Sequence, residues 1–333
     1  MTPIPSLALL LLVASIVAVS PAQKPKRAPK PGVATPGVKL PMSKLTPEAV
    51  FDVPGAPDWL AIGDEVWVSN APKNTVARLD PKTNKVLATI AVGKEPGSGL
   101  AIGFGSVWVP NCGESTVSRI DLETGELSAT FPCPTADSEG GIATGAGSVW
   151  LVKDSKSTLV RIDPATNKPA AEIEIAPGSV AVAFGFDSVW ITSPEKSVLS
   201  RVDPATTKLV ETIPVGPKPR FLAVGEGSVW TLNQGDGSIT RVDPRTNKVL
   251  ATIEAGIPGG GGEIAVGEGS VWATVWEFPI TRIDPATNQV AQQFAGPGGD
   301  SIRIGHGSVW LSNVRGDSVW RLDVKKLLAT KPD

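Results

Sequence analysis

The sequence predicts an all-β fold, a seven-bladed β-propeller of four-stranded antiparallel blades that is closed by an N-terminal strand in the last blade. Three observations predict this fold. A motif recurs seven times at a period of about 40 residues, each repeat contains short strand-like runs, and the last repeat lacks a strand that the N-terminal region can supply.

The recurring motif is a Val-Trp pair followed by Arg-(Leu/Ile/Val)-Asp. The distance from Trp to Asp is 13 residues in six repeats and 12 in the repeat that contains Trp272. A motif with such regular spacing indicates architecture rather than one reactive site. The Trp residues are Trp67, Trp108, Trp150, Trp190, Trp230, Trp272 and Trp310, and the Asp residues are Asp80, Asp121, Asp163, Asp203, Asp243, Asp284 and Asp323.

Each repeat contains four runs rich in Val, Ile and Thr, separated by Gly, Pro, Asn and Asp, which is typical of strands joined by tight turns. In the fifth repeat we expect strands at 221–224, 228–232, 238–243 and 249–253. The pattern of apolar residues does not predict helices.

The turn between the last two strands of a repeat has the form "DPRTNK", with close variants elsewhere. Pro presets φ for the second turn position, Asp accepts hydrogen bonds from turn amides, and Asn tolerates a left-handed conformation. This turn is missing after Asp323, where only "VKKLLATKPD" remains. The segment Glu48 to Val53 has the form of a fourth strand, so we expect it to complete the last blade and shut the ring.

The units "GEGSVWTLNQGDGSITRVDPRTNKVLATI" and "GFGSVWVPNCGESTVSRIDLETGELSATF" resemble the repeats of YVTN-type and YncE-like seven-bladed propellers and of the related streptogramin B (virginiamycin B) lyase family. The resemblance extends from Glu48 to about Asp323. The lyase branch implies opening of a cyclic depsipeptide ester by elimination, with a catalytic His and a carboxylate-held Mg²⁺. The chain has one His, His306, which the topology places on the face opposite the ligand face, so an enzyme of this kind would need a base of another type.

Residues 1–22 are predicted to be a signal peptide, because Pro5 to Val19 is apolar and "SPAQ" offers small residues before Gln23. Export to the periplasm or outside the cell follows. Residues 23–45 are rich in Pro and Lys and predict a basic, disordered linker, with residues 46–333 forming the propeller.

The linker carries six of the 31 Lys and Arg residues and none of the 33 Asp and Glu residues, so the rest of the chain has a formal net charge of −8. An acidic propeller is a poor nucleic-acid surface, since phosphate binding needs clustered Lys and Arg. The linker could touch an anionic envelope surface weakly, and a plain solvated role is the alternative. We expect a monomer.

Cys112 and Cys133 are the only cysteines. In propeller topology they lie in connections on one face, and in an exported chain we expect a disulfide that closes a loop of 22 residues and adds about 3 kcal/mol. Two unpaired thiols are the alternative.

Function is expected where the repeat breaks, since the seven repeated Trp residues are predicted to pack between blades. The innermost strands place a small residue in the central tunnel six times, but Arg303 at the seventh position. Two residues earlier lies a ring of varied chemistry that we define as the channel mouth, and it consists of Trp59, Gly99, Gly141, Ala181, Phe221, Glu263 and Ser301.

Arg303 needs an anion, because an unpartnered guanidinium is costly to bury. Glu263 or Asp300 could supply it internally, or a ligand could supply it while Trp59 and Phe221 cover the ligand's flat apolar part. The candidate ligand-binding residues are therefore Trp59, Phe221, Glu263, Asp300, Ser301 and Arg303. The glycine-rich run 256–263, Trp276 and the loop 313–317 lie on the same face.

The sequence thus predicts an exported propeller that binds a small molecule or a protein partner at the channel mouth without catalysis. One alternative is a streptogramin lyase-like or lactone-opening enzyme on the same face, and another is a structural scaffold. The sequence does not require a cofactor. It does not identify a catalytic residue or a cluster of metal ligands.

Overall fold

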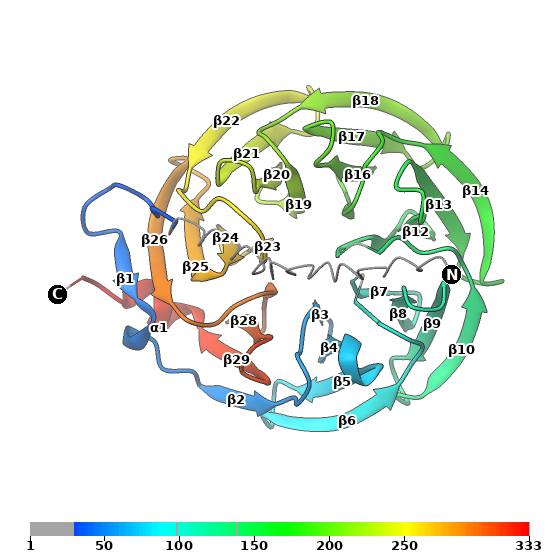
Figure 1. Cartoon of the computed structure of the whole chain (residues 1–333), viewed down its shortest axis with the longest axis horizontal. Helices are drawn as coiled ribbons and strands as arrows, with labels where there is room; N and C mark the ends of the chain where they lie inside the picture. The colour runs from blue at the N-terminus through cyan, green and yellow to red at the C-terminus, as the bar shows by residue number, and fades with distance from the viewer. Residues whose placement is uncertain (1–29, 98, 138, 333) are drawn as a thin grey trace, which may run out of the picture.

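The computed structural model describes residues 30–97, 99–137 and 139–332, which form a ring of seven sheets around a central tunnel (Figure 1). The predicted signal peptide and residues 23–29 lie outside the described residues. In each blade the strands run antiparallel, from an innermost strand beside the tunnel to an outermost strand at the rim. The predicted fold class is confirmed.

The first three blades follow one another along the chain. Blade 1 contains β3 (Leu60–Ile62), β4 (Val66–Asn70), β5 (Thr75–Asp80) and β6 (Lys85–Ala91). Blade 2 contains β7 (Ala101–Gly103), β8 (Ser106–Asn111), β9 (Thr116–Asp121) and β10 (Leu127–Pro132). Blade 3 contains β11 (Ile142–Gly145), β12 (Ser148–Val152), β13 (Thr158–Asp163) and β14 (Lys168–Glu174).

The next three blades repeat this order, and in blade 5 each observed strand ends within two residues of its predicted bounds. Blade 4 contains β15 (Val182–Gly185), β16 (Ser188–Ser193), β17 (Val198–Asp203) and β18 (Lys208–Pro214). Blade 5 contains β19 (Pro219–Gly225), β20 (Ser228–Asn233), β21 (Ser238–Asp243) and β22 (Lys248–Glu254). Blade 6 contains β23 (Glu263–Gly267), β24 (Ser270–Val275), β25 (Glu277–Asp284) and β26 (Gln289–Gly296).

Blade 7 is built from both ends of the chain, as predicted. Its strands β27 (Ile302–Gly305), β28 (Ser308–Asn313) and β29 (Ser318–Asp323) come from the C-terminal region. The N-terminal strand β2 (Ala49–Asp52) pairs antiparallel with β29, with Phe51 opposite Val319. The ring is therefore closed by the expected strand.

Two terminal segments differ from the expectations. The part of the predicted linker that the structure describes is not disordered: β1 (Lys39–Pro41) pairs in parallel with β26, and a short 3₁₀-helix (Met42–Lys44) follows it. Leu40 and Met42 are buried, and burying their apolar side chains is the reason why this stretch packs on blade 6 instead of remaining a solvated linker.

The second difference is α1 (Val324–Ala329), a helix that follows β29 where helix was not expected. The Asp323 side chain caps it by accepting a hydrogen bond from the Lys326 backbone N–H at 2.8 Å. Val324 and Leu327 bury its inner face. In the described residues, no helix has both the length and the apolar character needed to cross a membrane.

The seven repeated tryptophans form the wall between blades, each no more than 1% exposed. In six of them the indole Nε1 donates to the carbonyl of the glycine five residues earlier, at 3.0–3.1 Å. The arginine of Arg-x-Asp lies over the Trp ring in six blades, with Cζ 4.7–5.7 Å from the ring centroid. The structural interpretation of this motif is supported.

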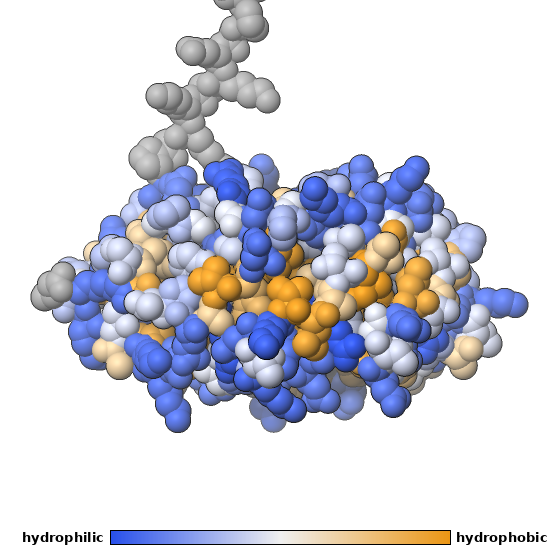
Figure 2. Space-filling view, turned by 90° about the horizontal axis from the view of Figure 1, so that it is seen from below, coloured by the Kyte–Doolittle hydropathy of each residue, from blue (hydrophilic) through white to orange (hydrophobic). Residues whose placement is uncertain are grey.

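The rim is less apolar than the blade interfaces but is not uniformly polar. Figure 2 shows apolar surface along one side of the ring, where β2, β6 and β10 expose large apolar side chains. These are Val50, Val86, Leu87 and Leu127.

Candidate functional site: the channel mouth

The innermost strands deliver the predicted mouth residues to one end of the tunnel, but their side chains pack against one another. Trp59 is 8% exposed, Phe221 is 1% exposed, and Glu263 and Ser301 are each 2% exposed. The mouth is therefore closed by its own side chains in this conformation.

Trp59 spans the channel. Its ring centroid lies 6.2 Å from that of Phe221 in blade 5, and the Arg303 guanidinium of blade 7 stacks 4.6 Å from its centroid. A Cβ added to Gly140 would approach the indole to 2.8 Å, so the far edge of the ring reaches blade 3. Contact of Trp59 or Phe221 with a ligand stays a prediction, although both residues also line the cavity in the tunnel.

Below Trp59 the tunnel continues as a cavity of about 520 Å³. Arg303 lies in its wall together with five of the six alanines that the sequence placed there, namely Ala101, Ala143, Ala183, Ala223 and Ala265. The small residues leave this space open because their side chains end at Cβ.

Glu263 and Arg303 form an ion pair between blades 6 and 7. The second carboxylate oxygen of Glu263 accepts hydrogen bonds from Ser301 Oγ and, at 3.2 Å, from the backbone N–H of Ile302. Burial raises the pKa of Glu263 to about 7, although the Arg303 charge opposes this rise. Of the two internal partners considered for Arg303, the structure therefore selects Glu263.

Asp300 instead lies beside Asp58, a residue that the sequence analysis did not single out. Burial raises the pKa of Asp58 well above its usual value, and the charges of Glu139 and Asp300 and a hydrogen bond with Asp300 raise it further. Two carboxyl groups that share a hydrogen bond must share a proton, because two adjacent buried anions repel each other. Asp300 also accepts a hydrogen bond from the Gly262 backbone N–H at 3.3 Å.

A second ion pair crosses the channel between blades 5 and 3. Arg220 Nη2 lies 3.3 Å from Glu139 Oε2, and both side chains are 36% exposed. Burial raises the pKa of Glu139, and Arg220 partly offsets this effect. This pair joins the entry of blade 3 to that of blade 5, past the blade between them.

These residues border a pocket of about 670 Å³, which we call the mouth pocket. Four acidic and two basic side chains line it, so its formal charge is negative. The charged lining residues are Asp58, Glu95, Asp137, Glu139, Lys94 and Arg220.

Sequence reasoning missed Asp58, Glu139 and Arg220 because it followed every second residue along the innermost strands. A signal was present: Asp58, Arg220 and Asp300 each directly precede a member of the mouth ring. In a strand, alternate residues point to opposite faces, but Asp58 and Asp300 precede β3 and β27, and Arg220 lies at a register shift in β19.

The resemblance to the lyases implied a His and a carboxylate-held Mg²⁺. His306 is exposed in the turn between β27 and β28, at the other end of the tunnel, with Nε2 2.9 Å from the Gly63 carbonyl oxygen. Within residues 30–97, 99–137 and 139–332, no group of three or more His, Cys, Asp or Glu side chains is arranged to hold a metal ion. The mouth carboxyls do not fit such a centre, since they bond to each other and to arginines.

No disulfide joins Cys112 and Cys133, which corrects the expected pairing. The Cys112 thiol, at the mouth pocket, donates to the Ala136 carbonyl at 3.2 Å. Cys133 is 1% exposed, and burial raises its pKa to about 11. The two thiols thus occupy different surroundings, one facing a backbone acceptor and the other packed in the apolar core between blades 2 and 3.

Comparisons with known proteins agree on the fold. A solved streptogramin B lyase superposes with a TM-score of 0.70 at 19% identity, covering 87% of this chain and 95% of that one. A catalytically inactive virginiamycin B lyase from Staphylococcus aureus with quinupristin gives 0.69 at 17% identity, covering 82% and 96%. Hydrazine synthase from Kuenenia stuttgartiensis gives 0.68 at 15% identity, covering 82% and 96%.

No protein-family model and no curated protein matches the sequence. The structural likeness therefore establishes a streptogramin B lyase-like propeller fold. Because proteins of different function share this fold at similar scores, activity has to be argued from the site.

Proposed function

We propose that this chain is a non-catalytic binding protein whose mouth pocket takes a ligand with a cationic group, either a small molecule or a basic side chain of a protein partner. The observation that carries the proposal is Asp58, which lines this acidic pocket and shares a hydrogen bond with the neighbouring Asp300. A cation can replace the shared proton, and the attraction is strong in a partly desolvated site.

The pocket's size supports a small ligand, since about 670 Å³ lies in the usual range for such sites. Glu139 and Arg220 at its border supply a further acceptor and donor for orientation. The proposal revises the ligand's charge, because Glu263 already neutralises Arg303.

Native mass spectrometry tests the proposal. The folded protein is incubated with a mixture of primary amines and their N-acetyl derivatives, and we expect retention of amines alone. The double variant Asp58→Asn/Asp300→Asn should lose them, while Asp64→Asn/Asp187→Asn, which removes two exposed carboxylates at the opposite face, should not. Equal retention of amines and N-acetyl derivatives would contradict the proposal.

A second candidate is an acid–base enzyme on the same face, with a carboxyl group in place of histidine. It is favoured by the pKa of Glu263, about 7, since a group that titrates near neutral pH can both take and give a proton. Incubation with quinupristin and Mg²⁺, followed by chromatography, tests it. A ring-opened product that wild type forms and Glu263→Gln does not would replace the binding proposal with this one.

We also propose export, with residues 1–22 as a leader; its support is the sequence alone. The protein isolated from the periplasm or medium should have the mass of a chain that begins at Gln23. A full-length mass in the cytoplasm would contradict export.

A further inference from the structure

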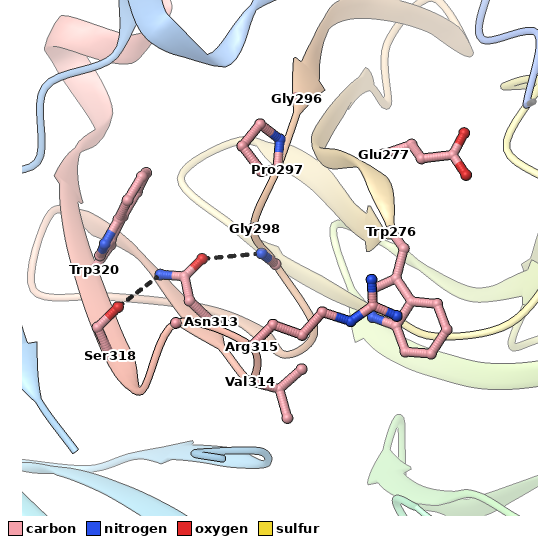
Figure 3. A pocket seen from close by; sticks show the side chains of 12 residues that line it. Trp276, Glu277, Gly296, Pro297, Gly298, Asn313, Val314, Arg315, Ser318 and Trp320 are labelled. Atoms are coloured by element: carbon pink, nitrogen blue, oxygen red, sulfur yellow. Dashed lines mark hydrogen bonds between the residues drawn. The ribbon is translucent and has the colours of Figure 1, made fainter. Parts of the chain in front are cut away.

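A second pocket, of about 750 Å³, lies between blades 6 and 7 on the same face as the mouth (Figure 3). Three loops form it: the β24–β25 loop, the β26–β27 loop and the β28–β29 loop. We call it the interblade pocket. Its lining is Trp276, Glu277, Gly296, Pro297, Gly298, Gly299, Asn313, Val314, Arg315, Gly316, Ser318 and Trp320.

The β26–β27 loop, which contains Gly298 and Gly299, forms one wall of this pocket mainly with its backbone. Gly299 has φ +77°, and a Cβ there would meet Thr274 Oγ1 at 2.6 Å. The Gly299 N–H donates to Asn313 Oδ1 at 3.0 Å, which fixes the loop against the β28–β29 loop. The wall is therefore held in place and lacks side chains that could fill the hollow.

Two of the three tryptophans outside the repeated series line this pocket. Trp320 replaces a small or β-branched residue that the other six blades carry at the same position, namely Ala77, Ser118, Val160, Ser200, Thr240 and Thr281. Trp276 is half-buried, and its Nε1 has no hydrogen-bond partner among the described residues. A buried indole N–H normally has an acceptor, so the wall holds an unused donor.

Arg315 supplies a cation to the same pocket. Its guanidinium stacks on the Trp276 ring, with Cζ 4.4 Å from the centroid, and the side chain is exposed. Among the ion pairs of the described residues none includes Arg315, whereas Arg303 pairs with Glu263 and Arg220 with Glu139. Stacking holds the guanidinium in one orientation and leaves its N–H groups available for an anion.

The charged residues of the lining are Arg315 and Glu277, so an anion that binds Arg315 is better tolerated with one charge than with two. Glu277 also lines the pocket, and its carboxylate accepts a hydrogen bond from the Lys30 backbone N–H at 3.3 Å. A pocket lined by one guanidinium and one carboxylate would repel a phosphate dianion more than a singly charged carboxylate. The exposed part of the Trp320 ring suits a flat apolar group.

We propose that the interblade pocket binds an aromatic carboxylate, with the carboxylate on Arg315 and the aromatic ring against Trp320. This ligand differs in charge from the one proposed for the mouth pocket. The site therefore stands on its own observations, and its test does not depend on the mouth.

The test compares 2-naphthoate with its neutral analogue 2-naphthamide by isothermal titration calorimetry on the full chain. Wild type should bind the carboxylate at least tenfold more tightly than the amide. Arg315→Gln should remove this preference, while Arg245→Gln, which removes an arginine that is exposed in the turn between β21 and β22, should keep it.

Trp320→Ser provides a second variant that should fold, because Ser118 and Ser200 occupy the same position in blades 2 and 4. It should weaken both probes about equally. The proposal is wrong if wild type shows no binding of 2-naphthoate, if Arg315→Gln binds it as tightly as wild type, or if Arg245→Gln weakens it as much as Arg315→Gln.

Discussion

At the scale of single residues, the mouth is distinguished by acidic side chains whose pKa values are raised. Asp58, Glu139 and Glu263 all have raised pKa values, and burial is the largest cause for each. Arg303 and Arg220 compensate Glu263 and Glu139, while no ion pair among the described residues includes Asp58. The raised pKa of Asp58 therefore makes the stability of the mouth depend on pH.

Asp58→Asn is expected to stabilise the protein at high pH. Because the folded-state pKa is raised above the usual 3.8, the folded state binds more protons than the unfolded state between these two values. The protonated Asp58 carboxyl therefore contributes fully to the stability of the folded state below pH 3.8, and this contribution is lost as the pH rises through the raised pKa. Asn imitates the protonated carboxyl, so Tm should change little at pH 4 and rise at pH 8.

Thermal melts followed by circular dichroism at pH 4, 6 and 8 measure the Tm change caused by Asp58→Asn. Asp187→Asn is the control, since it removes an exposed carboxylate in a turn at the other end of the tunnel. An equal Tm change at pH 4 and pH 8 for Asp58→Asn would show that the carboxyl pair does not titrate as described.

Arg303→Met is expected to destabilise the protein at pH 8 by about 3–5 kcal/mol, the usual cost of leaving one partner of a buried ion pair alone. The loss should be smaller at pH 5, where the isolated Glu263 can protonate. The double variant Glu263→Gln/Arg303→Met should recover most of the loss. Denaturant unfolding at both pH values measures these effects, and losses in the double variant that simply add would contradict the pairing.

At the scale of elements, the N-terminal region works as two separate strands. β2 completes blade 7 and buries Phe51, while β1 adds a fifth strand to blade 6 and buries Leu40. β2 is needed to give blade 7 its fourth strand and so to close the ring. β1 instead covers the edge of β26, whereas the outer strand of the other blades has no strand beside it.

Truncations at the N-terminus should separate the two contributions. Relative to a chain that begins at Lys30, deletion through Lys44 should cost on the order of 3 kcal/mol, because Leu40 and Met42 lose their burial. Deletion through Gly55 should cost far more, since it also removes β2 and exposes the edge of β29. Thermal melts of the three chains measure these effects. If the chain truncated through Lys44 has the same Tm as the chain that begins at Lys30, β1 adds no stability.

At the scale of the whole molecule, four of the motif arginines each tie their blade to the turn of the next one. Arg201 Nη1 donates to the Pro244 carbonyl at 2.8 Å and to Asn247 Oδ1 at 2.9 Å, both in the turn of the following blade. Arg119 and Arg241 make the same pair of contacts. Arg321 makes them to blade 1, across the seam where the chain ends meet.

Replacing Arg201 or Arg321 by Lys should therefore cost roughly 1–3 kcal/mol each, since Lys keeps the charge but has one nitrogen, whereas Arg donates through Nε to a serine of its own blade and through Nη1 to both turn acceptors. Arg245→Lys, at an exposed arginine, is the control and should be neutral. Guanidinium unfolding measures the three variants. A loss in Arg245→Lys as large as that in Arg201→Lys would remove the tie between blades as its explanation.

The sequence by itself determined the ring. The spacing of Val-Trp and Arg-x-Asp, the turn residues and the missing last strand sufficed to predict seven blades and their closure by β2, because these are local, repeated patterns. It also placed Trp59, Phe221, Glu263 and Ser301 at the mouth, since strand alternation fixes the face on which a side chain lies, but it missed Asp58, Glu139 and Arg220.

Only the tertiary structure decided how those side chains combine. Arg303 could pair with Glu263, Asp300 or a ligand, and the choice depends on the approach of blades 6 and 7. The contacts of Asp58 with Asp300 and of Arg315 with Trp276 join residues from different blades, and β1 pairs with a strand some 250 residues away. Such contacts depend on blade-to-blade geometry, which a repeat pattern within one chain segment does not contain.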